Sequence, residues 1–226
     1  GTINLLKYAS KFEVKKFIFS SSATVYGNPS TDCYKEDLPL LPANTYGETK
    51  AMIEKILIDL YNSNKKKLSV AILRYFNPVG AHNSGLIGEN PKGLPNNLMP
   101  YIAQVALGNL PSLPVYGNDY STPDGTGMRD YIHVDDLARG HLLALQYISK
   151  KPQLLIVNLG TGKPYSVLEM IKCFEYVSGK KIPFHFLKKR TGDLPKYYAD
   201  PNLAKKLLGW TAEYNLQKMC EDAWRF

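Results

Sequence analysis

A tyrosine and a lysine lie four residues apart at the start of a segment with helical periodicity. Tyr46 and Lys50 would share one face of that helix, so a phenol and an ammonium can reach the same reacting centre. An ammonium beside a phenol favours the phenolate, which can remove a proton from an alcohol. Most tyrosine–lysine pairs with this spacing are ordinary surface residues, so the spacing alone is a weak signal.

A run of serines, Ser20 to Ser22, follows the apolar residues Phe17 to Phe19, which predict a buried strand. In a doubly wound sheet, ligands bind outside the carboxyl ends of the strands, where these serines would lie. The alternative interpretation is a polar strand end that enters a loop. The serines precede Tyr46 by about two dozen residues, and together the two groups are more informative than either alone.

The elements that would position these residues alternate between helix and strand. Apolar spacing predicts a helix over 2–12, a strand over 15–21, a helix over 46–61 capped by Asn44 or Thr45, and a strand over 68–75. This alternation predicts an α/β fold with a doubly wound parallel sheet. After Pro78 the chain is rich in Gly, Pro and Asn, which indicates a second, smaller α/β domain. Further elements are predicted there, namely helices over 96–107, 134–148 and 203–208, the last with Asp200 as cap and Pro201 as its first residue, a strand over 154–159, and a Ser166/Glu169 capping box.

Composition excludes several classes of protein. The 226 residues are 44% hydrophobic and 21% charged, which is typical of a folded globular chain. Three widely spaced cysteines and four histidines without metal-ligand spacing argue against a disulfide scaffold or a metal site, and favour a reducing, cytoplasmic location. The net charge of +8 is scattered, without a basic helix, and no apolar run reaches membrane-spanning length, so neither nucleic acid nor membrane is expected as a partner.

Ser22, Tyr46 and Lys50 match the catalytic trio of the short-chain dehydrogenase/reductase superfamily. Longer motifs resemble those of one extended branch, the UDP-glucose (UDP-galactose) 4-epimerases, from end to end of the chain. These motifs are Arg74 to His82, Pro95 to Pro100, Gly117 to Tyr120, Gly125 to Val134 and Asn158 to Gly162. The resemblance implies NAD as cofactor and the reversible interconversion of UDP-glucose and UDP-galactose through transient oxidation at sugar C4.

The resemblance also implies roles for individual residues. Tyr46 would be the base, Ser22 would hydrogen-bond the 4-hydroxyl, and Lys50 would favour the phenolate and hold the nicotinamide ribose. Cofactor contacts fall on Ser22, Tyr46, Lys50, Tyr75, Phe76 and Pro78. Substrate contacts fall on Ser22, Tyr46, Asn77, Asn97, Leu98, Pro114, Val115, Tyr116, Arg129, Arg190, Asp193 and Tyr197. Residues 1–78 would form the C-terminal part of a Rossmann-type NAD-binding domain, and residues 79–226 mainly a UDP-sugar-binding domain, with segments that cross back.

Arg129 and Arg190 are implied to bind the diphosphate, because a planar guanidinium can hold phosphate oxygens with two bonds. Without the resemblance, Arg129 beside the adjacent Asp130 reads as a structural ion pair and Arg190 as a solvated side chain. Asp193 would hold the uridine ribose and Tyr116 the uracil. Tyr197 falls where bulk beside the sugar's 2-substituent varies, which favours UDP-glucose and UDP-galactose over N-acetyl sugars.

One departure from the family pattern concerns the cofactor. The Gly-rich dinucleotide fingerprint is absent, since Gly160-Thr161-Gly162 lacks a third glycine at the right place. We therefore expect a fragment that lacks about 100 N-terminal residues of a full nucleotide-binding unit and a short C-terminal tail. The chain begins at Gly1 without Met or a signal peptide, in line with that expectation.

Two other functions remain open from the sequence. A nucleotide-sugar 4,6-dehydratase of the same superfamily would share the fold, but it needs an Asp-Glu pair where this chain has Ala23 and Thr24. A non-catalytic UDP-sugar-binding fragment is the other. The resemblance further implies a homodimer formed through the helices at 2–12 and 46–62.

Overall fold

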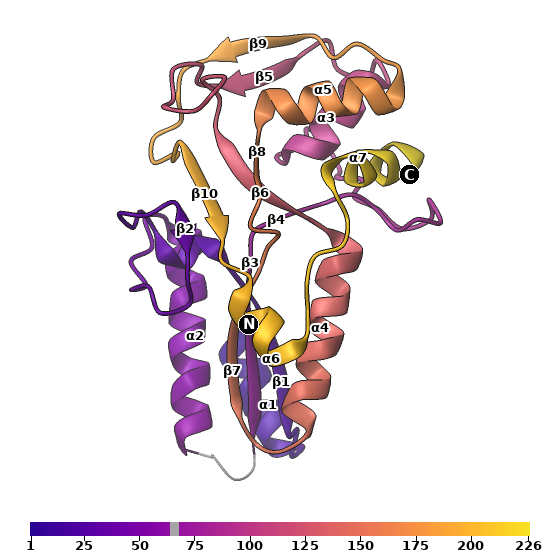
Figure 1. Ribbon diagram of the computed structural model, residues 1–226. Coiled ribbons are helices and arrows are strands. Elements are labelled where there is room, and N and C mark those ends of the chain that lie inside the picture. Colours follow the sequence, from indigo (N-terminus) through magenta and orange to yellow (C-terminus); the bar gives the residue numbers. More distant parts are fainter. Residues whose placement is uncertain (64–67) are drawn as a thin grey trace. The chain divides into compact units, whose positions relative to one another are not determined.

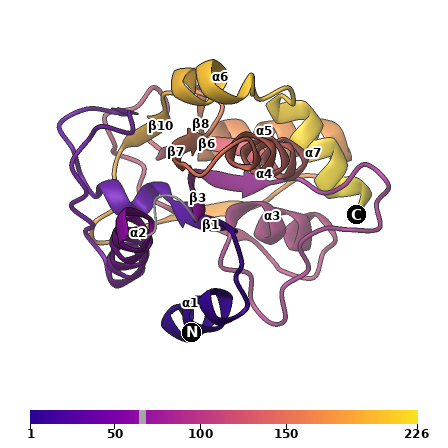
Figure 2. The ribbon, with the colours of Figure 1, turned by 90° about the horizontal axis from the view of Figure 1, so that it is seen from below.

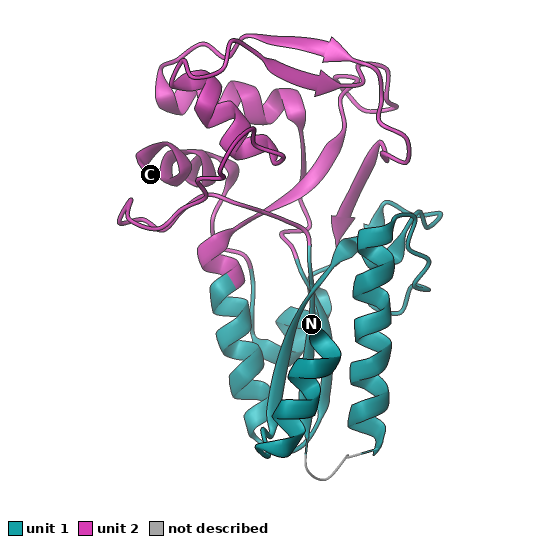
Figure 3. Cartoon of the chain, turned by 180° about the vertical axis from the view of Figure 1, so that it is seen from behind, with its two compact units in different colours: residues 1–75, 138–159, 200–211 teal, residues 76–137, 160–199, 212–226 magenta. Residues whose placement is uncertain are grey.

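The computed structural model describes residues 1–63 and 68–226, which form two compact units (Figure 3). Unit 1 comprises residues 1–75, 138–159 and 200–211, and unit 2 comprises residues 76–137, 160–199 and 212–226. The chain therefore crosses between units more than once, where the sequence indicated a main boundary near residue 78. Two later segments belong to unit 1, because the strand Leu154–Leu159 pairs with the strand Ser69–Tyr75 and the helix Asn202–Leu208 packs against Leu154–Leu159.

Unit 1 is built on a three-stranded parallel sheet in which β3 lies between β1 and β7 (Figure 1). In Figure 2, α2 and α4 lie on opposite sides of this sheet. Its elements are α1 (Thr2–Lys11), β1 (Lys16–Ser22), the 3-10 turn η1 (Ala23–Tyr26), β2 (Cys33–Tyr34), α2 (Thr45–Ser63), β3 (Ser69–Tyr75), α4 (Val134–Ser149) from residue 138 on, β7 (Leu154–Leu159) and α6 (Asn202–Leu208). The predicted α/β class with a parallel sheet is confirmed.

The core beneath α1 and α2 explains why these apolar residues recur at helical spacing. Leu6 and Leu57 project from the two helices onto Val70 and Ile72 of β3, and all four are buried. Burial of such side chains stabilises by about 1.5–3 kcal/mol each. This packing fixes α2, which carries Tyr46 and Lys50, against the sheet.

The caps test the predicted helix boundaries. Asn44 caps α2, since its Oδ1 accepts the backbone N–H of Gly47 at 2.8 Å. The Ser166/Glu169 capping box is present at the start of α5 (Val167–Ser178). The cap of α6 differs from the prediction. Pro201 occupies the cap position, while the Asp200 carboxylate accepts the N–H of Asn202 at 2.9 Å.

Unit 2 combines short parallel strands with a helical layer. Strands β10 and β4 both pair in parallel with β6, β8 pairs with β6 antiparallel, and β5 pairs with β9. Its elements are β4 (Asn77–Val79), α3 (Leu98–Ala106), β5 (Leu113–Tyr116), β6 (Met128–His133), β8 (Pro164–Ser166), α5 (Val167–Ser178), β9 (Phe184–Leu187), β10 (Lys196–Ala199) and α7 (Leu216–Arg225). Met99, Ile102, Phe174 and Met219 form much of the core between helices α3, α5 and α7.

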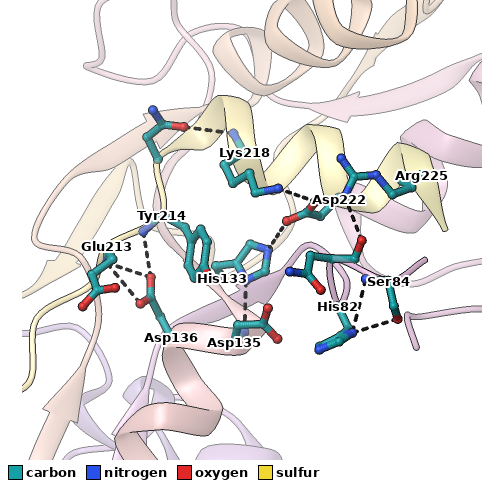
Figure 4. Close-up of polar contacts among 12 residues, drawn as sticks. His82, Ser84, His133, Asp135, Asp136, Glu213, Tyr214, Lys218, Asp222 and Arg225 are labelled. Atoms are coloured by element: carbon teal, nitrogen blue, oxygen red, sulfur yellow. Dashed lines mark hydrogen bonds and ion pairs between the residues drawn. The ribbon is translucent and has the colours of Figure 1, made fainter. Parts of the chain in front are cut away.

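Helix α7 is anchored by a buried polar cluster (Figure 4). His133 Nδ1 accepts the N–H of Asp135 at 3.0 Å, so the ring proton lies on Nε2, which donates to Asp222 at 3.2 Å. Lys218 and Arg225 also contact the Asp222 carboxylate, at 2.8 and 3.2 Å. His133 thus has a hydrogen-bonding role in joining β6 to α7.

No helix within residues 1–63 and 68–226 is long and apolar enough to cross a membrane.

Candidate active site

Ser22 ends β1 and begins the turn that follows. Its Oγ accepts hydrogen bonds from the N–H and the hydroxyl of Thr24, at 3.2 and 2.9 Å. The hydroxyl of Ser22 keeps its own proton for donation to an acceptor. Ser22 is therefore fixed at the carboxyl end of a parallel strand, which is where ligands bind in sheets of this kind.

The first turn of α2 packs directly on the backbone that follows Ser22. A Cβ on Gly47 would lie 2.6 Å from the carbonyl oxygen of Thr24, so only glycine permits this approach. Gly47 is the residue next to Tyr46. The absence of a side chain at position 47 thus brings the Tyr46 turn close to the Ser22 strand end.

Lys50 lies between this helix and the sheet. Its Nζ donates to the carbonyl oxygen of Ser20 at 2.8 Å and lies 5.5 Å from the ring centroid of Tyr46. Partial burial lowers the pKa of Lys50. Among the described residues this carbonyl uses one of the three N–H groups, which leaves two for hydroxyl groups of a ligand. Tyr46 itself is half exposed.

Three further residues were predicted to contact a cofactor, and they fall at the change from unit 1 to unit 2 along the chain. Tyr75, at the end of β3, packs 6.1 Å from the ring of His141 in unit 1. Phe76 is buried in unit 2, with its ring 6.0 Å from that of Tyr197, and Pro78 lines a cleft of unit 2. Contact of these residues with a cofactor stays a prediction.

Unit 2 contains a cleft of about 470 Å³ between α3, β5, β6 and the loop at 190–193. Most predicted substrate residues of this unit line it, namely Asn77, Asn97, Leu98, Pro114, Val115, Tyr116, Arg129, Arg190 and Asp193. Tyr197 is not among the lining residues. Its ring packs against the Arg129 guanidinium at 4.6 Å, and its hydroxyl lies 3.5 Å from Asn77 Oδ1.

Two guanidinium groups converge on one carboxylate in this cleft. Arg190 Nε donates to Asp193 at 2.8 Å, and an Arg129 nitrogen lies 3.9 Å from the other carboxylate oxygen. Arg129 is held in place by the carbonyls of Met128 and Leu194, at 2.9 and 2.8 Å. Two cations against one anion leave positive charge in the cleft, which suits a ligand with phosphate oxygens.

The interpretation of Arg129 and Asp130 as a structural ion pair is wrong. Adjacent residues of a strand point to opposite faces, and Asp130 turns away from the cleft. Its carboxylate accepts the N–H and hydroxyl of Thr161 and the N–H groups of Gly162 and Ala199, at 2.6 to 3.0 Å. Burial raises the pKa of Asp130, and these four donors oppose that shift. Arg190 is half exposed, but its guanidinium contacts the ring of Tyr116 and donates to Asp193. Arg190 is therefore part of the cleft rather than a purely solvated side chain.

Tyr120 is a cleft residue that the sequence analysis did not assign to the site. Its hydroxyl is buried and has no hydrogen-bond partner among the described residues. Burial raises the pKa of Tyr120, as does the nearby Asp193, against the effect of Arg129. An unpaired buried hydroxyl costs free energy, so this atom fits a ligand oxygen that completes its hydrogen bonding. The only sequence signal was its place in the Gly117 to Tyr120 motif.

Comparisons with known proteins agree with this geometry. A sequence model of the NAD dependent epimerase/dehydratase family matches residues 1–160. The chain belongs to this family. It is 56% identical over 226 residues to the UDP-glucose 4-epimerase of Bacillus subtilis, covering 100% of this chain and 66% of that protein.

Solved structures of the NAD dependent epimerase/dehydratase family superpose closely. The UDP-glucose 4-epimerase of Stenotrophomonas maltophila, solved with NAD and formylated UDP-arabinopyranose, has a TM-score of 0.96 at 49% identity, over 99% of this chain and 66% of that one. The enzyme of Bifidobacterium longum, in complex with NAD+ and UDP, has a TM-score of 0.94 at 49% identity, over 99% and 67%. The Rossmann-type fold class is thereby confirmed. The chain spans about two thirds of the length of these relatives.

Proposed function

We propose that the protein interconverts UDP-glucose and UDP-galactose with NAD as cofactor. The observation that carries the proposal is the packing of the Tyr46 turn and Lys50 of α2 against the strand end that holds Ser22. The family membership and the 56% identity to a UDP-glucose 4-epimerase support it. Binding alone would not require a tyrosine, a lysine and a serine in this arrangement.

Unit 1 would supply the acid–base chemistry. Tyr46 Oη, as phenolate, takes the proton from the sugar's 4-hydroxyl, and Ser22 Oγ hydrogen-bonds that hydroxyl and keeps it aligned. Lys50 Nζ stabilises the phenolate through its positive charge. Tyr46 later returns the proton to the same oxygen, which restores the alcohol.

The residues of unit 1 fit a nicotinamide cofactor. Two N–H groups of Lys50 are left for ribose hydroxyls by its contact with Ser20, and Ser22, Tyr46 and Tyr75 lie at the carboxyl ends of β1 and β3 or on the adjoining helix. Bound there, NAD would supply the hydride acceptor and donor that transient oxidation at sugar C4 requires. Phe76 and Pro78 are the further residues that we assign to its binding.

Unit 2 would recognise the nucleotide. Arg129 and Arg190 bind the diphosphate, Asp193 holds the ribose, and Tyr116 contacts the uracil. Tyr120 would donate its unpaired hydroxyl to a phosphate or ribose oxygen. The amides of Asn77 and Asn97, with Leu98, Pro114 and Val115, would complete the contacts to substrate.

The experiment that tests this function is proton NMR of the anomeric region after incubation with UDP-galactose and NAD. The protein made from its complete gene should yield a mixture of UDP-glucose and UDP-galactose. A 4-keto-6-deoxy product would instead identify a dehydratase, a reaction that Ala23 and Thr24 disfavour because neither is an acid. Tight UDP binding without turnover would mean that the protein only binds nucleotide sugars.

Substrate choice should depend on Tyr197. Its bulky ring is held between Arg129 and Phe76, so it cannot swing away from the sugar's 2-substituent without loss of both contacts. We expect kcat/KM to be much lower for UDP-N-acetylglucosamine than for UDP-glucose. Steady-state kinetics with both substrates checks this. Tyr197→Gly should reduce the difference in kcat/KM between the two substrates. Equal kcat/KM values for the native protein would contradict it.

We also propose a homodimer formed through α1 and α2. Ile3, Leu5 and Tyr8 of α1, Phe12 immediately after it and Met52 of α2 are all more than half exposed, although the two helices share one buried core. Exposed apolar patches of this kind mark interfaces, and a second copy with the same helices buries them symmetrically. Sedimentation velocity should give a dimer for the native protein and a monomer for Met52→Glu. Leu142→Glu on α4, where the native leucine is equally exposed, should leave the dimer intact.

A cytoplasmic location completes the proposal. Cys33, Cys173 and Cys220 are thiols rather than disulfides, and thiols persist in reducing compartments. The proposed chemistry on nucleotide sugars agrees with that location.

A further inference from the structure

A buried charged pair lies beneath the proposed catalytic helix. Glu54 of α2 and Arg74 of β3 have side chains that are 0% and 4% exposed. Arg74 NH2 donates to Glu54 Oε2 at 2.7 Å and Arg74 Nε donates to Oε1 at 3.0 Å, which is a two-bond, planar contact. Burial lowers the pKa of Arg74, but the hydrogen bonds and charge interactions with Glu54 and Tyr26 together outweigh burial and hold this pKa above its ordinary value.

The pair is the centre of a larger network. Ser21 Oγ of β1 donates to Glu54 Oε1 at 2.5 Å, so the carboxylate joins both strands to the helix. The remaining Arg74 nitrogen, NH1, donates to the Tyr26 hydroxyl at 3.1 Å, and Tyr26 donates to Asn158 of β7 at 2.7 Å. One guanidinium thereby links all three strands of the sheet, at a row where Ser21, Arg74 and Asn158 are register partners.

The network lies next to the proposed catalytic residues. Tyr46, Lys50 and Glu54 are spaced by four and lie on one face of α2, and Ser21 immediately precedes Ser22. Glu54 therefore ties the helix to the same strand end that carries Ser22. Stability alone gives weak reason for such a pair, since well-packed apolar residues of similar volume are often as stabilising as a buried ion pair.

We propose that Glu54 and Arg74 are positioning residues that set the register of α2, so that Tyr46 and Lys50 stand in reacting geometry beside Ser22. The proposal rests on the function proposed above. Displacement of a reacting group by about 1 Å costs about 100-fold in rate. An apolar replacement of the pair can keep the fold while the helix loses this register.

The test compares the double variant Glu54→Leu/Arg74→Met with the native protein made from its complete gene. We expect a cooperative thermal transition, a kcat lowered by about 10- to 100-fold and a KM for UDP-galactose that changes little, because the nucleotide cleft belongs to unit 2. The matched control is Lys55→Gln/Asp59→Asn, which removes an exposed ion pair from the same helix. This control should keep the native kcat. A folded double variant with native kcat would overturn the proposal.

If the double variant fails to fold, Arg74→Lys decides, because it keeps the charge and removes the planar two-bond contact. It should show the same selective loss of kcat, and native kcat in this variant would overturn the proposal.

A second readout does not require turnover. The rate of acetylation of Lys50 by acetic anhydride, followed by mass spectrometry, reports how firmly its Nζ is held on the Ser20 carbonyl. The double variant should raise this rate several-fold toward that of Lys55, and the control should not. Native Lys50 reactivity in the double variant would overturn the proposal even if the native protein turned over no UDP-sugar, in which case the proposed function alone would fail.

Discussion

Replacement of Tyr46 by phenylalanine should lower kcat by about 10²- to 10⁴-fold, the usual contribution of a positioned acid–base group. The change removes one oxygen and leaves the ring contact with Lys50 in place. Because the nucleotide cleft is built from unit 2, the dissociation constant for UDP should stay near the native value. Turnover of UDP-galactose by NMR and UDP binding by calorimetry measure the two quantities.

The matched control is Tyr61→Phe, a tyrosine of the same helix that packs near the core beneath α1 and α2. This variant should keep native turnover. Near-native kcat in Tyr46→Phe would show that Tyr46 is not the base and would leave Ser22 as the candidate.

Replacement of Arg129 by methionine should weaken UDP binding by about 10- to 150-fold. A hydrogen bond to a charged group contributes about 1.5–3 kcal/mol, and methionine fills similar space without any donor. Calorimetric titration with UDP measures the change. Thermal unfolding measured in parallel separates it from any loss of stability that follows from the freed carbonyls of Met128 and Leu194.

Two further variants serve as comparisons for Arg129→Met. Arg139→Met removes a partly buried arginine of α4 that lies outside the cleft and donates to the carbonyl of Thr211. This variant should leave UDP affinity unchanged. Tyr120→Phe removes the unpaired hydroxyl and should weaken binding by about fivefold, as expected for a neutral hydrogen bond of about 1 kcal/mol. Native affinity in Arg129→Met would show that the diphosphate binds elsewhere.

Local patterns predicted much of unit 1. The apolar run at Phe17 to Phe19 and the helical spacing after Asn44 gave β1 and α2 within one or two residues, because these elements are decided by nearby side chains. Most of the substrate-binding residues that the resemblance implied for unit 2 line one cleft.

Features set by distant parts of the chain were not predictable in this way. Asp130 lies beside Arg129 in sequence, yet its partners are Thr161 and Gly162 in the loop after β7 and Ala199 at the end of β10. Glu54 and Arg74 each look ordinary alone, and only the packing of α2 on the sheet brings them together. The return of residues 138–159 to unit 1 depends likewise on strand pairing between β3 and β7, which leaves no local signature.

The alternation of Arg129 and Asp130 along β6 has an evolutionary consequence. One face of the strand meets the cleft and the other is saturated by backbone donors, so mutations on the two faces fall under separate selection. Sequence drift at Arg129 would alter which ligands are accepted, whereas drift at Asp130 would be purged for instability. A lineage could therefore acquire a new nucleotide-sugar preference on an unchanged scaffold.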